Sequence, residues 1–159
     1  MTFGFSYIGL IMLLMLFIPN FIWTKHQPKD YDKYVQNENK VLLAFERIGQ
    51  VVVTTSALIF SNFNPKGWNL WCLVLILALL NLVVYDLAWV RYFKSEKTMK
   101  DFYRGFLGMP LALATYPVVA FFLIGIYGGN IIMVIGAVIL GIGHIGIHAS
   151  HRKEVYGQS

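Results

Sequence analysis

The chain alternates between long apolar stretches and short polar segments, and this pattern predicts its elements. Five stretches, at about 5–23, 41–60, 69–89, 106–127 and 130–148, are mainly apolar. A helix needs about 20 such residues to cross a hydrocarbon core of about 30 Å. The runs are continuous and do not alternate, which favours helices over barrel strands. We therefore predict an all-α fold, a polytopic integral membrane bundle of five transmembrane helices that forms a single membrane domain over 1–159.

The composition agrees with this pattern and excludes several classes of protein. Of the 159 residues, 57% are hydrophobic and only 13% are charged, whereas soluble domains are about 25% charged. The many aromatic residues exclude a disordered chain, and a single cysteine, Cys72, excludes a disulfide scaffold. We expect a multi-pass protein of the cell membrane, of the bacterial cytoplasmic kind.

The basic residues predict how the helices are oriented. Of the 13 Lys and Arg residues, Lys66 alone lies in a connection on one side of the membrane. The others lie in or close to the segments 24–40, 90–105 and 149–159 on the other side. Because cytoplasmic loops carry the excess of Lys and Arg, the N-terminus is predicted to be outside and the C-terminus cytoplasmic.

The net charge of +5 also bears on the partners of the protein. The basic residues lie at the cytoplasmic surface, where anionic lipid headgroups attract them. No fold or motif in the sequence supports a nucleic-acid partner. The partners that we expect are the lipid bilayer, its anionic headgroups, and either a second copy of the chain or a larger membrane complex.

Ionisable residues within the predicted spans are few, and each is a candidate for function because charge in the membrane is costly. They are Glu46 and Arg47 in the second span, Asp86 in the third, and His144 and His148 in the fifth. At 1.5 Å per residue, Glu46, Asp86 and His144 lie about 7–12 Å below the cytoplasmic surface. We expect Glu46, Asp86 and His144 to converge within about 8 Å, in one polar cluster.

Helical periodicity adds residues to the faces of this cluster. Gln50 lies one turn after Glu46, and Thr54 one turn further, so that the second span has one polar stripe. In the fifth span, Ala137 and Gly141 precede the histidines on a single stripe, where small residues allow a neighbouring helix to approach closely. In a subunit of a larger complex, this stripe is the expected docking face.

Three interpretations of the cluster stay open. The first is a satisfied network that holds the bundle together. The second is a ligand or substrate pocket in the cytoplasmic leaflet, which includes catalysis on a lipophilic molecule with a histidine or Glu46 as acid or base. The third is the handling of protons or of a divalent metal, since His144 and His148 have the i, i+4 spacing of a helical metal pair. No cofactor beyond that metal is indicated.

The hypothesis that we prefer is a small multi-pass membrane protein that binds or transports a small molecule or an ion in the cytoplasmic leaflet. Its candidate residues are Glu46, Arg47, Gln50, Asp86, His144 and His148. The alternatives are a membrane-embedded enzyme that acts on a lipophilic substrate and a non-catalytic subunit of a larger membrane complex. The sequence assigns no catalytic residue and leaves open whether the protein is an enzyme.

Overall fold

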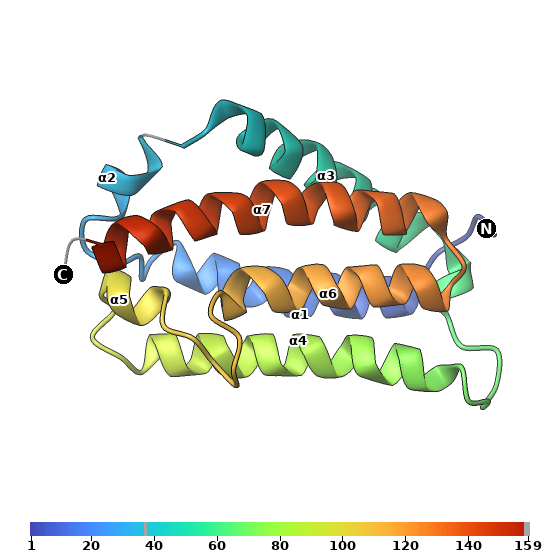
Figure 1. Cartoon of the computed structure of the whole chain (residues 1–159). Helices are drawn as coiled ribbons and strands as arrows, with labels where there is room; N and C mark the ends of the chain where they lie inside the picture. Colours follow the sequence, from blue (N-terminus) through green and yellow to red (C-terminus); the bar gives the residue numbers. More distant parts are fainter. Residues whose placement is uncertain (37, 158–159) are drawn as a thin grey trace.

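Helices form the regular structure of the chain (Figure 1). The computed structural model describes residues 1–36 and 38–157, and within these ranges it has helices, two isolated backbone bridges and no strand. In chain order the elements are α1 (Tyr7–Trp23), α2 (Tyr31–Val35), α3 (Lys40–Ile59), the 3-10 turn η1 (Ser61–Phe63), α4 (Cys72–Phe93), α5 (Met99–Phe102), α6 (Ala112–Tyr127) and α7 (Ile131–Gly157). The prediction of an all-α fold is confirmed.

Three helices of the described chain, α3, α4 and α7, are long and apolar enough to cross a membrane. The helices α1 and α6 are also apolar but shorter, with 17 and 16 residues. Each of the five predicted stretches therefore contains a helix, and three of these helices have the length and composition of a membrane span.

The helix α6 begins at Ala112 and not near residue 106, where the apolar stretch begins. Residues 106–109 instead form a tight turn, in which the backbone groups of Phe106 and Met109 exchange two hydrogen bonds of 3.0 Å. Leu107 and Gly108 adopt positive φ angles of 46° and 80° in this turn. Pro110 follows and disfavours a helical conformation of the residue before it. Turn chemistry therefore shortens the helix although the residues are apolar.

The helix α7 is longer than predicted, because it continues past 148 to Gly157. Its last turns are polar and include Arg152, Lys153 and Glu154. Arg, Lys and Glu are good helix formers, and the end of an apolar run does not end a helix unless a breaking residue follows. The extension also brings His151, which is 3% exposed, into the packed part of the structure.

The helices α3 and α7 pack together through glycine. A Cβ atom on Gly143 of α7 would overlap the backbone nitrogen of Glu46, and one on Gly49 of α3 would overlap the backbone of Leu140. On another face of α7, Ala137 is fully buried and Gly141 faces Val118 of α6. The small-residue stripe of α7 is thus covered within the chain, which corrects its interpretation as an exposed docking face.

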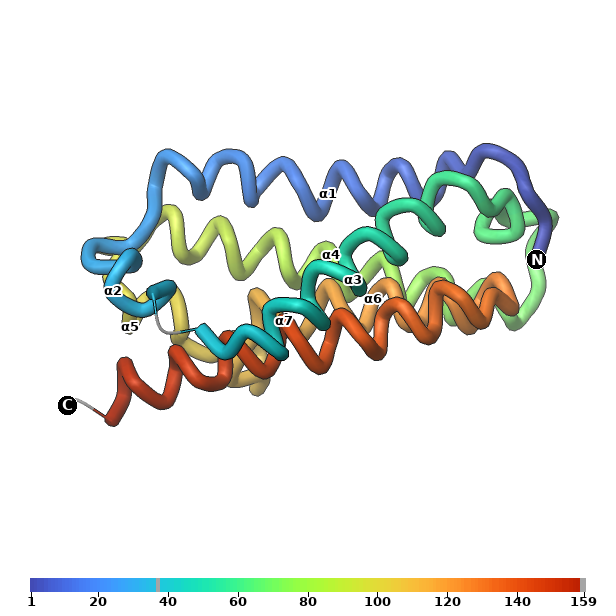
Figure 2. Tube along the Cα trace, turned by 90° about the horizontal axis from the view of Figure 1, so that it is seen from above, coloured from blue at the N-terminus to red at the C-terminus, as the bar shows by residue number. Residues whose placement is uncertain are grey.

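At its other end, α3 packs closely against α1. A Cβ atom on Gly9 would overlap the carbonyl oxygen of Ala57. The backbone nitrogens of Gly4 and Ser6 donate to the carbonyl oxygens of Ile59 and Leu58, at 2.9 and 3.0 Å. The contact with α7 extends along α3 from Leu42 to Val53, whereas α1 approaches α3 near Ala57. The helix α3 crosses the bundle obliquely, and α1 and α3 diverge from the crossing point (Figure 2).

The two ends of the bundle differ in character. The N-terminus, η1 and the turn between α6 and α7 lie at one end, and α2, α5 and the end of α7 lie at the other (Figure 1). The basic segments 24–40, 94–104 and 152–153 belong to this second end. In a membrane, such an arrangement presents most of the positive charge to a single surface.

Replacing Gly143 with alanine tests the packing of α3 against α7. We expect the free energy of unfolding to fall by about 1–3 kcal/mol, because the added methyl group forces the two backbones apart. Chemical unfolding in detergent micelles, followed by circular dichroism, measures the change.

Gly141→Ala is the matched control, since it lies in the same helix and its Cβ would meet only side-chain atoms, with Val118 Cγ1 nearest at 3.1 Å. An equal loss of stability in both variants would contradict the assignment of a special role to Gly143.

Candidate functional site

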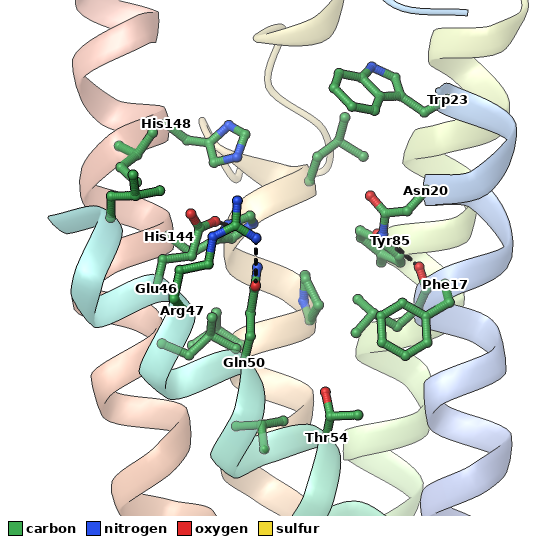
Figure 3. Close-up of a pocket in the computed structure, with 18 of the residues that line it drawn as sticks. Phe17, Asn20, Trp23, Glu46, Arg47, Gln50, Thr54, Tyr85, His144 and His148 are labelled. Carbon is green, nitrogen blue, oxygen red and sulfur yellow. Dashed lines mark hydrogen bonds and ion pairs between the residues drawn. The ribbon is translucent and has the colours of Figure 1, made fainter. Parts of the chain in front are cut away.

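A cavity of about 720 Å³ lies among α1, α3, α4, α6 and α7. In Figure 3, residues of α3 and α7 line one side of it, and residues of α1 and α4 line the other. Tyr31 of α2 and Phe102 of α5 line it at the end of the bundle where those short helices lie. The cavity exists because α1 and α3 diverge toward this end.

The polar side of the cavity is built around Glu46 and His144. The carboxylate oxygen Oε1 of Glu46 lies 2.5 Å from Nδ1 of His144. The two side chains are only 13% and 23% exposed. Gly143 places the backbone of α7 directly against that of α3 at Glu46, so the packing of the helices positions this pair.

Further polar residues of α3 extend this side of the cavity (Figure 3). Arg47 Nη1 donates a hydrogen bond to Gln50 Oε1 at 3.5 Å, and Thr54 lines the cavity one turn beyond Gln50. The stripe of Glu46, Gln50 and Thr54 expected from helical periodicity therefore faces the cavity, with the exposed Arg47 beside it.

The opposite side is mainly aromatic and apolar. Phe17 and Trp23 of α1 and Trp89 of α4 line it. One polar contact interrupts this surface, because Asn20 Nδ2 donates to the hydroxyl of Tyr85 at 2.8 Å and to the carbonyl of Leu16 at 2.7 Å. The cavity thus has a polar side and an apolar side that face each other.

A network of histidines leads from Glu46 toward α5. The rings of His144 and His148 lie 4.5 Å apart between centroids. The hydroxyl of Tyr103 lies 3.2 Å from Nδ1 of His148 and 2.9 Å from Nδ1 of His151. One hydroxyl has one proton, so Tyr103 can donate to one imidazole only while it accepts from the other. The two histidines therefore differ in whether Nδ1 carries a proton.

Glu38 stands at the outer end of this network. Its Oε1 lies 3.5 Å from Nε2 of His151. Burial raises the pKa of the Glu38 carboxyl, and the negative charge of Glu46 raises it further. Burial also raises the pKa of the Tyr103 hydroxyl, so this hydroxyl keeps its proton near neutral pH and remains a donor to one of the histidines.

Asp86 does not join the cluster, and the expected convergence of Glu46, Asp86 and His144 is not found. The side chain of Asp86 lies in a second, smaller groove between α1 and α4, of about 380 Å³. Its neighbour Tyr85 lines the large cavity. Successive residues of a helix point about 100° apart, which turns Asp86 away from the cavity although its depth is similar to that of Glu46.

No metal centre is evident in the described ranges, 1–36 and 38–157. They contain no group of three or more His, Cys, Asp or Glu side chains that is suited to hold a metal ion. The metal interpretation of His144 and His148 stays a prediction from their spacing in the sequence.

Several polar residues of the site were not among the candidates from the sequence. They include Asn20, Glu38, Tyr85, Tyr103 and His151. A polar residue inside an apolar run was a usable signal for Asn20. Thr98 and Asp101 form a capping box at the start of α5, and this pattern locates the short helix that precedes Tyr103. Glu38 lies in a polar connection without any periodicity, and no signal marks it.

Comparisons of the chain with protein-family models, curated protein sequences and solved structures give no match. The fold alone therefore defines the class. Three helices of the described chain are long and apolar enough to cross a bilayer, which indicates a helical membrane protein.

Replacing Tyr103 with phenylalanine tests the network at its centre. We expect a loss of about 1–3 kcal/mol in the free energy of unfolding, because the buried Nδ1 atoms of two histidines lose their shared partner. Chemical unfolding in micelles measures the loss.

Tyr34→Phe serves as the control. The ring of Tyr34 contacts the ring of His151, with 6.2 Å between centroids, and the substitution keeps this ring while it removes the hydroxyl. Unfolding of Tyr103→Phe at the same denaturant concentration as the wild type would rule out a stabilising role for the shared hydroxyl.

Proposed function

We propose that the protein is a five-span membrane protein that binds a small amphipathic molecule in the cavity between α1 and α3, as a step in its transport. The observation that carries the proposal is the cavity itself. Its volume of about 720 Å³ lies within the range of about 300–1,000 Å³ that is common for ligand sites. Its polar side faces its aromatic side, as an amphipathic ligand requires.

The polar side offers hydrogen-bonding groups to such a ligand. Glu46 and His144 pair through Oε1 and Nδ1. Within the described residues, neither Glu46 Oε2 nor His144 Nε2 has a hydrogen-bond partner, although both residues line the cavity. These two atoms are available to a polar group of a ligand, and the partial mutual neutralisation of the pair lowers the cost of keeping them in the membrane.

The apolar side suits the body of the ligand, and the bilayer supplies its route of entry. Phe17 of α1 lines the cavity and is 38% exposed. Val51 of α3 also lines the cavity and is 67% exposed. The cavity therefore opens sideways between α1 and α3, and a lipophilic molecule reaches it without leaving the membrane.

An enzyme acting on a lipophilic substrate is the second candidate. A carboxylate that holds Nδ1 of an imidazole orients the ring and leaves Nε2 to accept or donate a proton. Glu46 and His144 have this relation. Chemical change of the bound molecule distinguishes such an enzyme from a binding protein or a transporter.

The binding proposal predicts saturable binding of aminoanthracene, a neutral fluorescent amphiphile. In a Trp68→Phe, Trp71→Phe background, the remaining tryptophans are Trp23 and Trp89, and both line the cavity. Energy transfer from them to the probe should saturate. We expect Thr54→Phe to weaken binding by about tenfold, since the larger side chain fills the cavity.

Ile48→Phe is the control, because Ile48 lies on the same helix, is 56% exposed and does not line the cavity. Energy transfer that rises linearly with probe concentration, or that is equal in both variants, would indicate partition into lipid and defeat the proposal.

The proposed topology predicts which positions a membrane-impermeant maleimide labels in intact cells. In a Cys72→Ser background, we expect labelling of Thr2→Cys and Lys66→Cys from outside, and labelling of Lys94→Cys only after permeabilisation. A reporter fused to the C-terminus should be cytoplasmic, beside the anionic headgroups that the basic segments attract.

If α3 and α7 cross, these positions also test the crossings of α1, α4 and α6. If α7 crosses and both position 94 and the C-terminus are cytoplasmic, another crossing must lie between them, and α6 is the helix that can supply it. Labelling of Thr2→Cys only after permeabilisation would contradict the crossing of α1.

A further inference from the structure

The groove between α1 and α4 holds a carboxylate without a partner. The oxygen Oδ1 of Asp86 is buried, and no group in the described residues forms a hydrogen bond with it. The surroundings of this carboxylate are apolar side chains of α1 and α4, among them Ile18 and Val90. Such a group within a membrane-spanning helix is costly unless a cation or a hydrogen-bond donor joins it.

The other residues that line this groove are apolar, apart from the indole of Trp89. They include Met15 and Pro19 of α1, and Pro19 has no N–H to donate to a neighbouring group. Among the described residues, the groove thus combines one carboxylate acceptor with largely apolar walls. This chemistry fits a cationic side chain with several N–H donors, such as a guanidinium.

The chain itself carries such a side chain at the matching depth. Arg47 lies seven residues inside α3, counted from Lys40, and Asp86 lies seven residues before the end of α4 at Phe93. Both counts start from the end of the bundle that carries α2 and α5, so both side chains lie about 10 Å in from that end.

The guanidinium of Arg47 is also available to pair with a carboxylate. This group is exposed, and in the described residues it bonds to Gln50 at 3.5 Å and forms no ion pair with a carboxylate. It lies at the opening between α1 and α3, whereas Asp86 lies between α1 and α4. The two groups face opposite flanks of α1, so they do not meet within one chain.

We propose that copies of this chain associate side by side in the membrane, with Arg47 of one copy entering the α1–α4 groove of the next and pairing with Asp86. Each copy then uses two different surfaces, which is a heterologous interface. Exposed apolar residues of α1, such as Leu14 at 49% and Ile18 at 54%, pack around the ion pair. Lipid competes equally for apolar surfaces, so the polar contact gives the interface its specificity.

Cysteine cross-linking in proteoliposomes tests this interface. In a Cys72→Ser background, Ala44→Cys lies one turn from Arg47 and Val90→Cys one turn from Asp86, both toward the α2–α5 end. We expect a disulfide-linked dimer when the two single-cysteine proteins are mixed before oxidation. Neither protein alone should form it, because a heterologous contact brings position 44 of one copy to position 90 of the next.

Charge substitutions then test the ion pair. Arg47→Asp is introduced into both of the single-cysteine proteins, or Asp86→Arg is introduced into both. We expect either substitution to lower the dimer yield by about tenfold. The double substitution should restore the yield, which also shows that the reversed chain folds. Asp86→Asn, which keeps the shape of the side chain but removes its charge, should also lower the yield, by less than Asp86→Arg because it places no like charge opposite Arg47. As a spatial control, Ile142→Cys on α7, which is 49% exposed, should not cross-link with Val90→Cys.

Absence of the dimer in the mixed sample would overturn self-association and leave the groove to another cationic partner. Efficient cross-linking of a single-cysteine protein with itself would contradict the heterologous arrangement. A yield unaffected by the charge substitutions would contradict the pairing of Arg47 with Asp86.

Discussion

The close approach of α3 to two different helices is the constraint on which the other features depend. Glycine removes the side chain at both contacts, Gly9 against α3 near Ala57 and Gly143 against α3 near Glu46. The contact with α1 lies near one end of α3, and α3 diverges from α1 toward its other end while it stays against α7 (Figure 2). The space that opens between α1 and α3 is therefore a result of backbone geometry, and the same contact at Gly143 brings Glu46 to His144.

Most of the polar side chains in this bundle contact one another. The Glu46–His144 pair adjoins the cavity, and the Tyr103 hydroxyl lies between Nδ1 of His148 and Nδ1 of His151, the second of which belongs to the extension of α7. Several buried side-chain atoms of the described chain have no internal hydrogen-bond partner, and Oδ1 of Asp86 is the carboxylate oxygen among them. A membrane protein that leaves one carboxylate unsatisfied while another surface carries an unpaired guanidinium is well suited to assembly.

The sequence was sufficient for the helices and for part of the site. Apolar run length located all five long helices, and periodicity placed Glu46, Gln50 and Thr54 on one face. Depth alone was not sufficient for Asp86, because depth does not specify direction, and one position along α4 separates the cavity-lining Tyr85 from the groove. The turn at 106–109 and the contact between Glu38 and His151 depend on local backbone conformation and on tertiary packing, which hydropathy does not encode.

The lengths of the helices have a consequence for the surrounding lipid. With 17 residues, α1 rises about 26 Å, less than the hydrocarbon core of about 30 Å, whereas the 27 residues of α7 rise about 40 Å. In the five-span topology that we propose, a bilayer around α1 has to thin, while α7 has to tilt or project beyond the bilayer. The thinnest lipid then adjoins the side of the molecule where both the cavity and the Asp86 groove open. The thickness of the host membrane therefore affects access to the cavity and to the groove.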